Sequence, residues 1–199
     1  GKTSLASAMV RTLKQVGQKL LLLAPTGRAA KVFALNSGLA AYTIHRKIYR
    51  ERAYTGIDGS FSLNDNLHAD TLFLVDESSM ISNGMGEGQT FGSGCLLDDL
   101  MQFVYSGRNC RIMFIGDNAQ LPPVGESESP AMSKQMIEGY GMTVYQAHLD
   151  EVVRQGADSG ILYNATAIRL MATRNEATMM PRIRLKGFAD VEVVRGDEL

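Results

Sequence analysis

Short apolar runs alternate along this sequence with segments that favour helices. The runs are residues 19–25, 71–77, 111–117 and 142–149. Short runs of this kind are typical of strands that are buried on both faces of a parallel sheet. Helices are expected around and between them, at residues 4–16, 26–36, 95–106, 130–138 and 158–173. Because strands and helices alternate, the sequence predicts an α/β fold in which helices cover both faces of a parallel sheet.

Two segments interrupt this alternation. Residues 53–63 place Asp58 and Gly59 between alternating side chains, which predicts a hairpin outside the main sheet. Residues 82–94 contain five glycines, a composition typical of a mobile loop.

The composition fits one domain with a buried core, because the chain has 199 residues of which 45% are hydrophobic. Two cysteines, Cys95 and Cys110, cannot form a disulfide framework, and the three histidines have no metal-ligand spacing. No apolar run approaches the ~20 residues of a membrane span, and no signal-peptide pattern opens the chain. We therefore expect a reducing, cytoplasmic setting and no membrane contact.

Basic residues are concentrated in the first third of the chain. Residues 1–56 carry ten Lys or Arg and one acidic residue, Glu51, whereas residues 57–199 carry ten basic and twenty acidic residues. The net charge of −1 hides this asymmetry. Solvated helix faces would explain it, and so would a surface that binds a polyanion.

The chain opens with GKTS, the last part of the phosphate-binding motif GxxxxGK[ST]. In that motif backbone N–H groups surround the phosphates, the lysine reaches the β and γ oxygens, and the hydroxyl binds Mg²⁺. Lys2 and Thr3 would have these roles. The tripeptide GKT is frequent by chance, but an expected helix follows at once, and phosphate sites use helix N-termini.

Two further expected strands end in polar residues. The strand at residues 71–77 ends in Asp76, which can bind the Mg²⁺ of a nucleotide, and Glu77, which can orient or deprotonate an attacking water. A solvent-exposed acidic strand end is the simpler alternative. The next strand stops at residues 116–117 and leads to Gln120 on a loop stiffened by two prolines. Since parallel sheets bind ligands at these strand ends, Gln120 is a candidate ligand sensor.

Six segments in this order carry a family resemblance: GKTSLA, LLLAPTGRAAK, TIHR, LFLVDESSM, IGDNAQLPPVG and LDEVVRQGADSGIL. They resemble successive motifs of superfamily 1 DNA helicases of the RecD/TraA type, which include the alpha subunit of exodeoxyribonuclease V. The resemblance extends from residue 1 to about residue 170. PTGRAAK and GDNAQLPPVG are far longer than chance matches.

The resemblance implies a RecA-like P-loop NTPase domain with ATP and Mg²⁺ as cofactors. It implies that Gln120 lies near the γ-phosphate, that the loop at residues 121–124 relays the phosphate state to DNA, and that Arg154 is an arginine finger. The implied nucleotide-binding residues are Gly1, Lys2, Thr3, Ser4, Asp76, Gln120 and Arg154. Of these, Thr3 and Asp76 would bind the metal, and Lys2, Gln120 and Arg154 would act in catalysis with Glu77. Without the family, Arg154 would be interpreted as a surface residue.

The resemblance also implies single-stranded DNA as a partner. The candidate DNA contacts are Pro25, Thr26, Gly27, Arg28, Lys31 and His45. PTGRAAK follows an expected strand and opens an expected helix, so its backbone N–H groups and Arg28 or Lys31 could meet DNA phosphates. For His45, a helix-cap or core position is an equal alternative.

Two features depart from the family pattern. Val153 stands where related helicases often carry an aromatic residue before the arginine. The phosphate loop lacks its upstream strand, and the second motor domain has no counterpart in the sequence. We therefore expect a first motor domain at residues 1–175 and an extension at residues 176–199, both part of a longer protein. We expect the isolated chain to have negligible ATP hydrolysis.

The sequence thus predicts the motor domain of an ATP-dependent DNA helicase, similar to the exodeoxyribonuclease V alpha subunit. It would hydrolyse ATP to move along single-stranded DNA in DNA repair, recombination or processing. Its partners would be that DNA, a second motor domain of the same chain and other subunits of a helicase–nuclease complex. A P-loop kinase or phosphotransferase and a non-catalytic DNA-binding subunit of a nuclease complex are the alternatives.

Overall fold

The computed structural model describes residues 2–51, 61–84, 91–120, 122–149, 158–173 and 180–194. They fall into two compact units, residues 2–148 and residues 149–199 together with Gly1. The domain boundary expected near residue 175 stays a prediction. Within the described ranges, no helix has the length and apolar character needed to cross a membrane.

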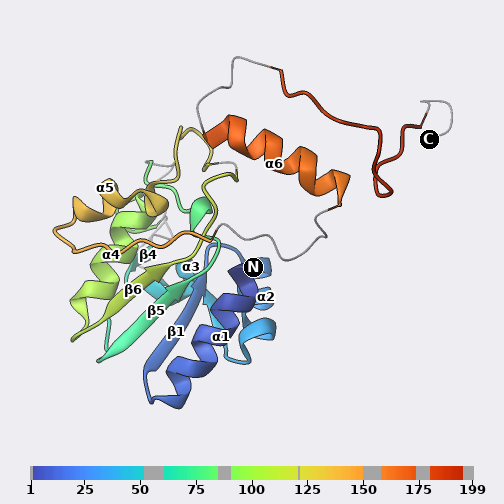
Figure 1. The fold of residues 1–199 in the computed structure, drawn as a ribbon. Coiled ribbons are helices and arrows are strands. Elements are labelled where there is room, and N and C mark those ends of the chain that lie inside the picture. Colours follow the sequence, from blue (N-terminus) through green and yellow to red (C-terminus); the bar gives the residue numbers. More distant parts are fainter. Residues whose placement is uncertain are drawn as a thin grey trace. The chain divides into compact units, whose positions relative to one another are not determined.

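The first unit is built on a four-stranded parallel sheet (Figure 1). Its strands are β1 (Lys19–Ala24), β2 (Ala41–Thr43), β5 (Thr71–Val75) and β6 (Arg111–Phe114), in the order β2-β1-β5-β6. Leu21 of β1 pairs with Phe73 of β5, and Leu74 of β5 pairs with Met113 of β6. All neighbouring pairs are parallel, so β1, β5 and β6 end at the same edge of the sheet.

One face of the sheet is covered by α1 (Lys2–Gln15) and α2 (Gly27–Ser37). Alternate residues of a strand point to opposite faces, and Leu22 and Leu74 point to this side. They pack there against Val10 of α1 and Phe33 of α2, and all four side chains are almost completely buried.

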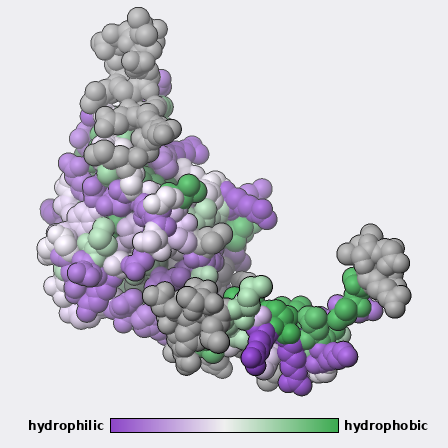
Figure 2. Space-filling model, turned by 90° about the horizontal axis from the view of Figure 1, so that it is seen from above, coloured by the Kyte–Doolittle hydropathy of each residue, from purple (hydrophilic) through white to green (hydrophobic). Residues whose placement is uncertain are grey.

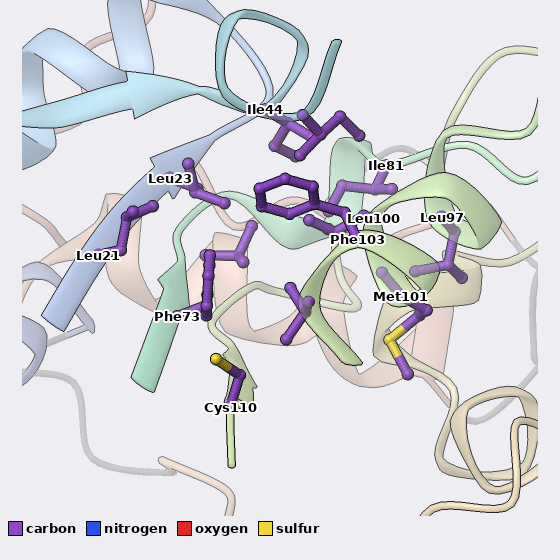
Figure 3. Packing of buried hydrophobic residues seen from close by; sticks show 14 of the residues in the cluster. Leu21, Leu23, Ile44, Phe73, Ile81, Leu97, Leu100, Met101, Phe103 and Cys110 are labelled. Carbon is purple, nitrogen blue, oxygen red and sulfur yellow. The ribbon is translucent and has the colours of Figure 1, made fainter. Parts of the chain in front are cut away.

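The opposite face is covered by α3 (Ile44–Ile48) and α4 (Leu96–Ser106). Figure 3 shows Leu23 and Phe73 of the sheet beside Phe103 of α4 in this core. The rings of Phe73 and Phe103 meet edge to face, with centroids 6.1 Å apart. The parallel sheet with helices on both faces, predicted from the sequence, is therefore confirmed.

A separate pair of antiparallel strands lies outside the main sheet, and only its second strand falls within residues 53–63, where the sequence predicts a hairpin. Its strands β3 (Tyr49–Glu51) and β4 (Phe61–Leu63) are antiparallel and form a two-stranded sheet. Asp58 and Gly59, the expected turn residues, lie outside the described residues.

Two predicted elements differ in the structure. Residues 142–149 are not a strand. Only Met142 and Val144 pack against the core there, whereas Tyr145 is 93% exposed, so this segment lacks the two-sided burial of a central strand. The helix expected at residues 130–138 is divided into the 3-10 helix η2 (Pro130–Met132) and α5 (Lys134–Glu138). Ser133 separates them, because its Oγ caps α5 by accepting from the Met136 N–H at 3.4 Å.

The second unit contains α6 (Gly160–Thr173), the helix expected at residues 158–173. Asp190 caps it by accepting from the Gly160 N–H at 2.7 Å and from the Ser159 hydroxyl at 2.6 Å. The Asn164 amide both donates to the Arg184 carbonyl and accepts from the Arg184 N–H, each at 2.8 Å. These bonds join Arg184 and Asp190 to α6. Figure 2 shows hydrophobic (green) and hydrophilic (purple) surface on this unit.

Candidate functional site

The candidate site lies where α1 begins and β5 and β6 end. Figure 1 shows the first turn of α1 beside the carboxyl ends of these strands. An ion pair joins the two regions, because Nζ of Lys2 lies 3.3 Å from Oδ2 of Asp117, just beyond β6. This edge is where open parallel sheets place their ligands.

Asp76 follows β5 directly. Its backbone N–H donates to the Leu23 carbonyl at 3.0 Å, which continues the sheet by one residue. One carboxylate oxygen, Oδ1, accepts from the Glu77 N–H at 2.9 Å. Burial raises the pKa of Asp76, and the Glu77 N–H and the charge of Lys2 partly offset this rise. Lys2 is therefore close enough to Asp76 to influence its charge.

Glu77 has an unusual backbone conformation. Its φ and ψ are 51° and 38°, the left-handed region that a residue with a Cβ rarely adopts. The surrounding bonds enforce it, since the buried Ser78 N–H donates to the Ile115 carbonyl at 2.9 Å and its Oγ to the Val75 carbonyl at 2.8 Å. Strain of this kind is concentrated at functional sites, and it falls here on the backbone of the residue that the sequence predicts to be the base.

The end of β6 approaches the turn after β5 very closely. A Cβ on Gly116 would lie 2.6 Å from Sδ of Met132 and 3.0 Å from the backbone nitrogen of Ser79. Only glycine fits this approach without movement of its neighbours. Gly116 therefore brings the loop that carries Asp117 and Gln120 against the 3-10 helix η1 (Ser78–Met80), which follows Glu77.

The ammonium of Lys2 is incompletely paired. Its Nζ is buried, and apart from the ion pair with Asp117 it makes no hydrogen bond of regular geometry with the described residues. A buried ammonium with unused donors is suited to a phosphate oxygen. Thr3, one residue further along α1, and Asp76 offer the hydroxyl and carboxylate oxygens that Mg²⁺ prefers.

Gln120 lies on the surface of the loop after β6. Its Oε1 accepts from the Ser79 hydroxyl at 3.4 Å, and its N–H donates to the Asp117 carbonyl at 3.1 Å. It is thus linked both to the turn that carries Glu77 and to the ion-pair partner of Lys2. The remaining predicted residues here are Ser4, which is exposed, and Gly1 and Arg154, which lie outside the described residues.

Sequence reasoning missed the role of Asp117 as the partner of Lys2. The available signal was its position, because Asp117 is the first acidic residue after β6 and lies three residues beyond its end, whereas Asp76 follows β5 directly. Both carboxylates come from adjacent strands, and α1 brings Lys2 to them.

The candidate DNA contacts lie mainly at the junction of β1 and α2. Thr26 caps α2, since its Oγ1 accepts from the Ala29 N–H at 3.2 Å. Arg28 and Lys31 are exposed on α2, as is Gly27, and Pro25 is half-buried before the cap.

His45 lies on a different helix, α3. Its ring is 5.7 Å from Tyr49 and 5.3 Å from Phe91 between centroids, and burial lowers its pKa. It has a packing role, and its contact with DNA stays a prediction.

Helices cover both faces of a parallel sheet, a lysine stands at the start of α1, and carboxylates lie at or just beyond the ends of adjacent strands. The fold and the site define the P-loop NTPase class of α/β domains. This is the fold class that the sequence predicts. The chain belongs to the AAA domain family, whose model matches residues 1–182. It is also 34% identical over 139 residues to the uncharacterized protein MJ1519 of Methanocaldococcus jannaschii. That alignment covers 63% of this chain and 11% of the archaeal protein.

Solved structures with some similarity are those of Pif1 helicases. Bacteroides Pif1 bound to ssDNA is 22% identical, with 71% of this chain and 30% of that chain covered and a TM-score of 0.34. Two Pif1 helicases that coordinate at forked dsDNA give 20% identity, coverages of 70% and 32%, and a TM-score of 0.37. The complex of Bacteroides sp Pif1 with ADP-AlF4 is 22% identical, with 70% of this chain and 30% of that chain covered and a TM-score of 0.34. These similarities are low, and the family assignment does not depend on them.

Proposed function

We propose that this chain is the ATP-hydrolysing motor domain of a DNA helicase of the RecD/TraA type. One observation supports the nucleotide-binding part of this proposal most directly: the buried, incompletely paired ammonium of Lys2 forms an ion pair with Asp117 and partly offsets the rise that burial causes in the pKa of Asp76 at the end of β5. A cation with free donors next to two acidic groups suits the triphosphate and Mg²⁺ of ATP.

The residues at the start of α1 hold the nucleotide. Backbone N–H groups of the first helical turn and the Lys2 ammonium bind phosphate oxygens. Thr3 and Asp76 hold Mg²⁺, which when bound polarises the phosphoryl group and neutralises its charge. Gly1 and Ser4 are the other residues of the motif that we expect to contact the phosphates.

The ion pair of Lys2 links nucleotide binding to the loop after β6. A phosphate oxygen on the Lys2 ammonium adds a second negative charge beside Asp117, so binding of ATP weakens this ion pair. Gln120 lies three residues further on the same loop. The loop therefore changes its contacts when the γ-phosphate is present, which is the property of a phosphate sensor.

Glu77 acts on the water. Its carboxylate orients the attacking water and accepts its proton as the β–γ bond breaks. Arg154, by the family resemblance, stabilises the charge that develops on the γ-phosphate. Both groups act on the transition state rather than on the affinity for ATP.

In the whole protein, hydrolysis would drive movement along single-stranded DNA in the cytoplasm, in DNA repair, recombination or processing. A second motor domain of the same chain would close on the nucleotide, and other subunits of a helicase–nuclease complex would be further partners. Arg28 and Lys31 would contact DNA phosphates, with Pro25, Thr26, Gly27 and His45 nearby.

The test is an ATPase assay on the full-length protein with and without single-stranded DNA, combined with nucleotide-binding measurements. Wild-type protein should hydrolyse ATP faster when DNA is present. Lys2→Ala should weaken ATP binding, whereas Glu77→Gln should bind ATP normally and lose turnover. Turnover stimulated by a small phosphate acceptor instead of DNA would indicate a phosphotransferase, and DNA binding without turnover would indicate a non-catalytic subunit.

A further inference from the structure

The two loops that follow β5 and β6 carry different parts of the proposed machinery. The first contains Glu77 and continues through η1 to residues 81–84. The second contains Gln120 and continues to Ser129. Hydrolysis in response to the γ-phosphate requires that these loops keep a defined relation to each other.

One carboxylate oxygen accepts three hydrogen bonds between the two loops. Oε1 of Glu126 accepts from the Ser82 hydroxyl at 2.7 Å, from the Asn83 N–H at 2.7 Å and from the Gly84 N–H at 2.9 Å. All three donors belong to the loop after β5, more than forty residues away in the sequence. Bonds to an ionised acceptor are about twice as strong as neutral ones.

The backbone at Glu126 is fixed by a turn. The Glu126 N–H donates to the Pro123 carbonyl at 3.0 Å, and Gly125 has a φ of 84°, which fits the third position of a type II turn. The carboxylate is therefore attached firmly to the proline-containing segment that begins just after Gln120. A shift of that segment is transmitted to residues 82–84.

Two other contacts join the same loops closer to the sheet. The Ser129 hydroxyl donates to the Ser79 carbonyl at 3.0 Å in a buried position, and the Ser79 hydroxyl donates to Gln120. The Glu126 contact differs from both, because it uses a partly exposed carboxylate and involves three donors. Its loss leaves no charge buried without a partner, so the fold should tolerate it.

We infer that Glu126 is a positioning residue that holds the loop carrying Glu77 and the loop carrying Gln120 in one arrangement. The effect on turnover rests on the proposed function, whereas the clamp between the loops does not. Glu126 lies outside the phosphate loop, so it affects the rate of hydrolysis rather than the affinity for ATP.

The experiment compares Glu126→Ala, Glu126→Gln and Glu128→Ala in the full-length protein. The first substitution removes the acceptor, and the second keeps an amide oxygen that can accept the same bonds. The third removes a charge from an exposed residue of the same loop and is the matched control. For Glu126→Ala, kcat for DNA-stimulated ATP hydrolysis should fall about 10- to 100-fold, as expected for a misplaced catalytic group. KM should stay within about twofold, and Glu126→Gln should recover most of kcat.

Amide hydrogen exchange of Asn83 and Gly84, whose backbone N–H groups donate to Glu126, gives a readout that is independent of activity. Exchange should become about tenfold faster in Glu126→Ala, and it should stay close to wild type in Glu126→Gln and Glu128→Ala. Normal kcat for Glu126→Ala in an active protein, or an equal loss in Glu128→Ala, would overturn the positioning role. A wild-type protein without ATPase activity would overturn the proposed function, and unchanged exchange in Glu126→Ala would overturn the clamp itself.

Discussion

Lys2 is the proposed phosphate-binding residue, and its ion pair with Asp117 joins it to the loop after β6. The carboxylate of its partner Asp117 lies beside the ammonium to which a phosphate would bind, and the side chains of this pair are 29% and 19% exposed. We expect Asp117→Asn to tighten nucleotide binding by about two- to fivefold, because partly exposed ion pairs contribute no more than about 1 kcal/mol. Titration of the full-length protein with a fluorescent ATP analogue measures this.

The control for Asp117→Asn is Lys2→Ala, which should weaken binding of the same analogue. If both substitutions weaken binding, Asp117 supports the nucleotide site directly instead of competing with the phosphate.

Asp76 should make stability depend on pH. Its raised pKa means that the folded protein holds the proton more firmly than the unfolded chain does. The stability contributed by the protonated carboxyl is complete below the ordinary pKa of 3.8 and is lost as pH rises through the folded-state pKa. Asp76→Asn should therefore be more stable than wild type at pH 7, and the difference should disappear in acid. Urea unfolding at a series of pH values measures it.

Asp70 provides a comparison of opposite sign. The hydrogen bond from Asn109 lowers the pKa of this exposed carboxylate. Asp70→Asn should lose a little stability at pH 7 and none in acid. If the stability differences of both variants changed with pH in the same direction, burial would not raise the pKa of Asp76.

At the residue level, the sequence indicates which groups meet at the strand ends but not how they pair. Asp76 and Glu77 are recognisable because two carboxylates end an apolar run. The left-handed backbone of Glu77 has no sequence signature, since glutamate is not favoured there. The clamp made by Glu126 could not be predicted either, because its donors are distant in sequence and two of them are backbone N–H groups.

At the level of elements, the junction between β6 and η1 depends on Gly116. Gly116→Ala should destabilise the protein by about 1–3 kcal/mol, the usual result of inserting a methyl group into a tight contact, here with the Met132 side chain and the Ser79 backbone nitrogen. Gly27→Ala is the matched control, because a Cβ there meets nothing within 4 Å. Chemical unfolding of both variants measures the difference. Equal stabilities would show that Met132 and the turn at Ser79 move aside at little cost.

Strands β1 and β5 are predictable from sequence because central strands of a parallel sheet are apolar throughout. Strand β6 lies at an edge of the sheet and is only partly buried, but its run of Ile112, Met113 and Phe114 is still apolar enough to be recognised. The edge strand β2 is not, since its three residues are only partly covered and Tyr42 is 38% exposed. The prediction of a strand at residues 142–149 was wrong because an apolar run does not always form a strand. The apolar residues of this segment contact the core on one side only, and periodicity alone does not distinguish such a segment from an edge strand.

At the level of the whole molecule, the basic first third of the chain can be tested as a DNA-binding surface. Each phosphate contact to a single strand contributes about 0.7 to the slope of log affinity against log salt concentration. Arg28 and Lys31 are both exposed on α2. The substitutions Arg28→Ala and Lys31→Ala should each flatten that slope by roughly this amount. A salt titration of fluorescent single-stranded DNA binding by the full-length protein measures it.

Arg108→Ala is the control for this titration, because Arg108 is exposed but belongs to the acidic remainder of the sequence. Its slope should equal that of wild type. Identical slopes for all variants would assign the basic residues of α2 to solvation alone.

The left-handed backbone of Glu77 also has a consequence for protein engineering. Glycine at this position would relieve steric strain and so raise the free energy of unfolding by about 1–2 kcal/mol. Its greater freedom in the unfolded chain would lower that free energy by about 0.5–1 kcal/mol. A library selected only for heat resistance should therefore enrich glycine at position 77, and the enriched variants should no longer hydrolyse ATP. Glu77→Gln, which keeps a Cβ, should gain no such resistance. Selection for thermal stability would thus favour glycine at position 77, whereas selection for ATP hydrolysis would favour glutamate.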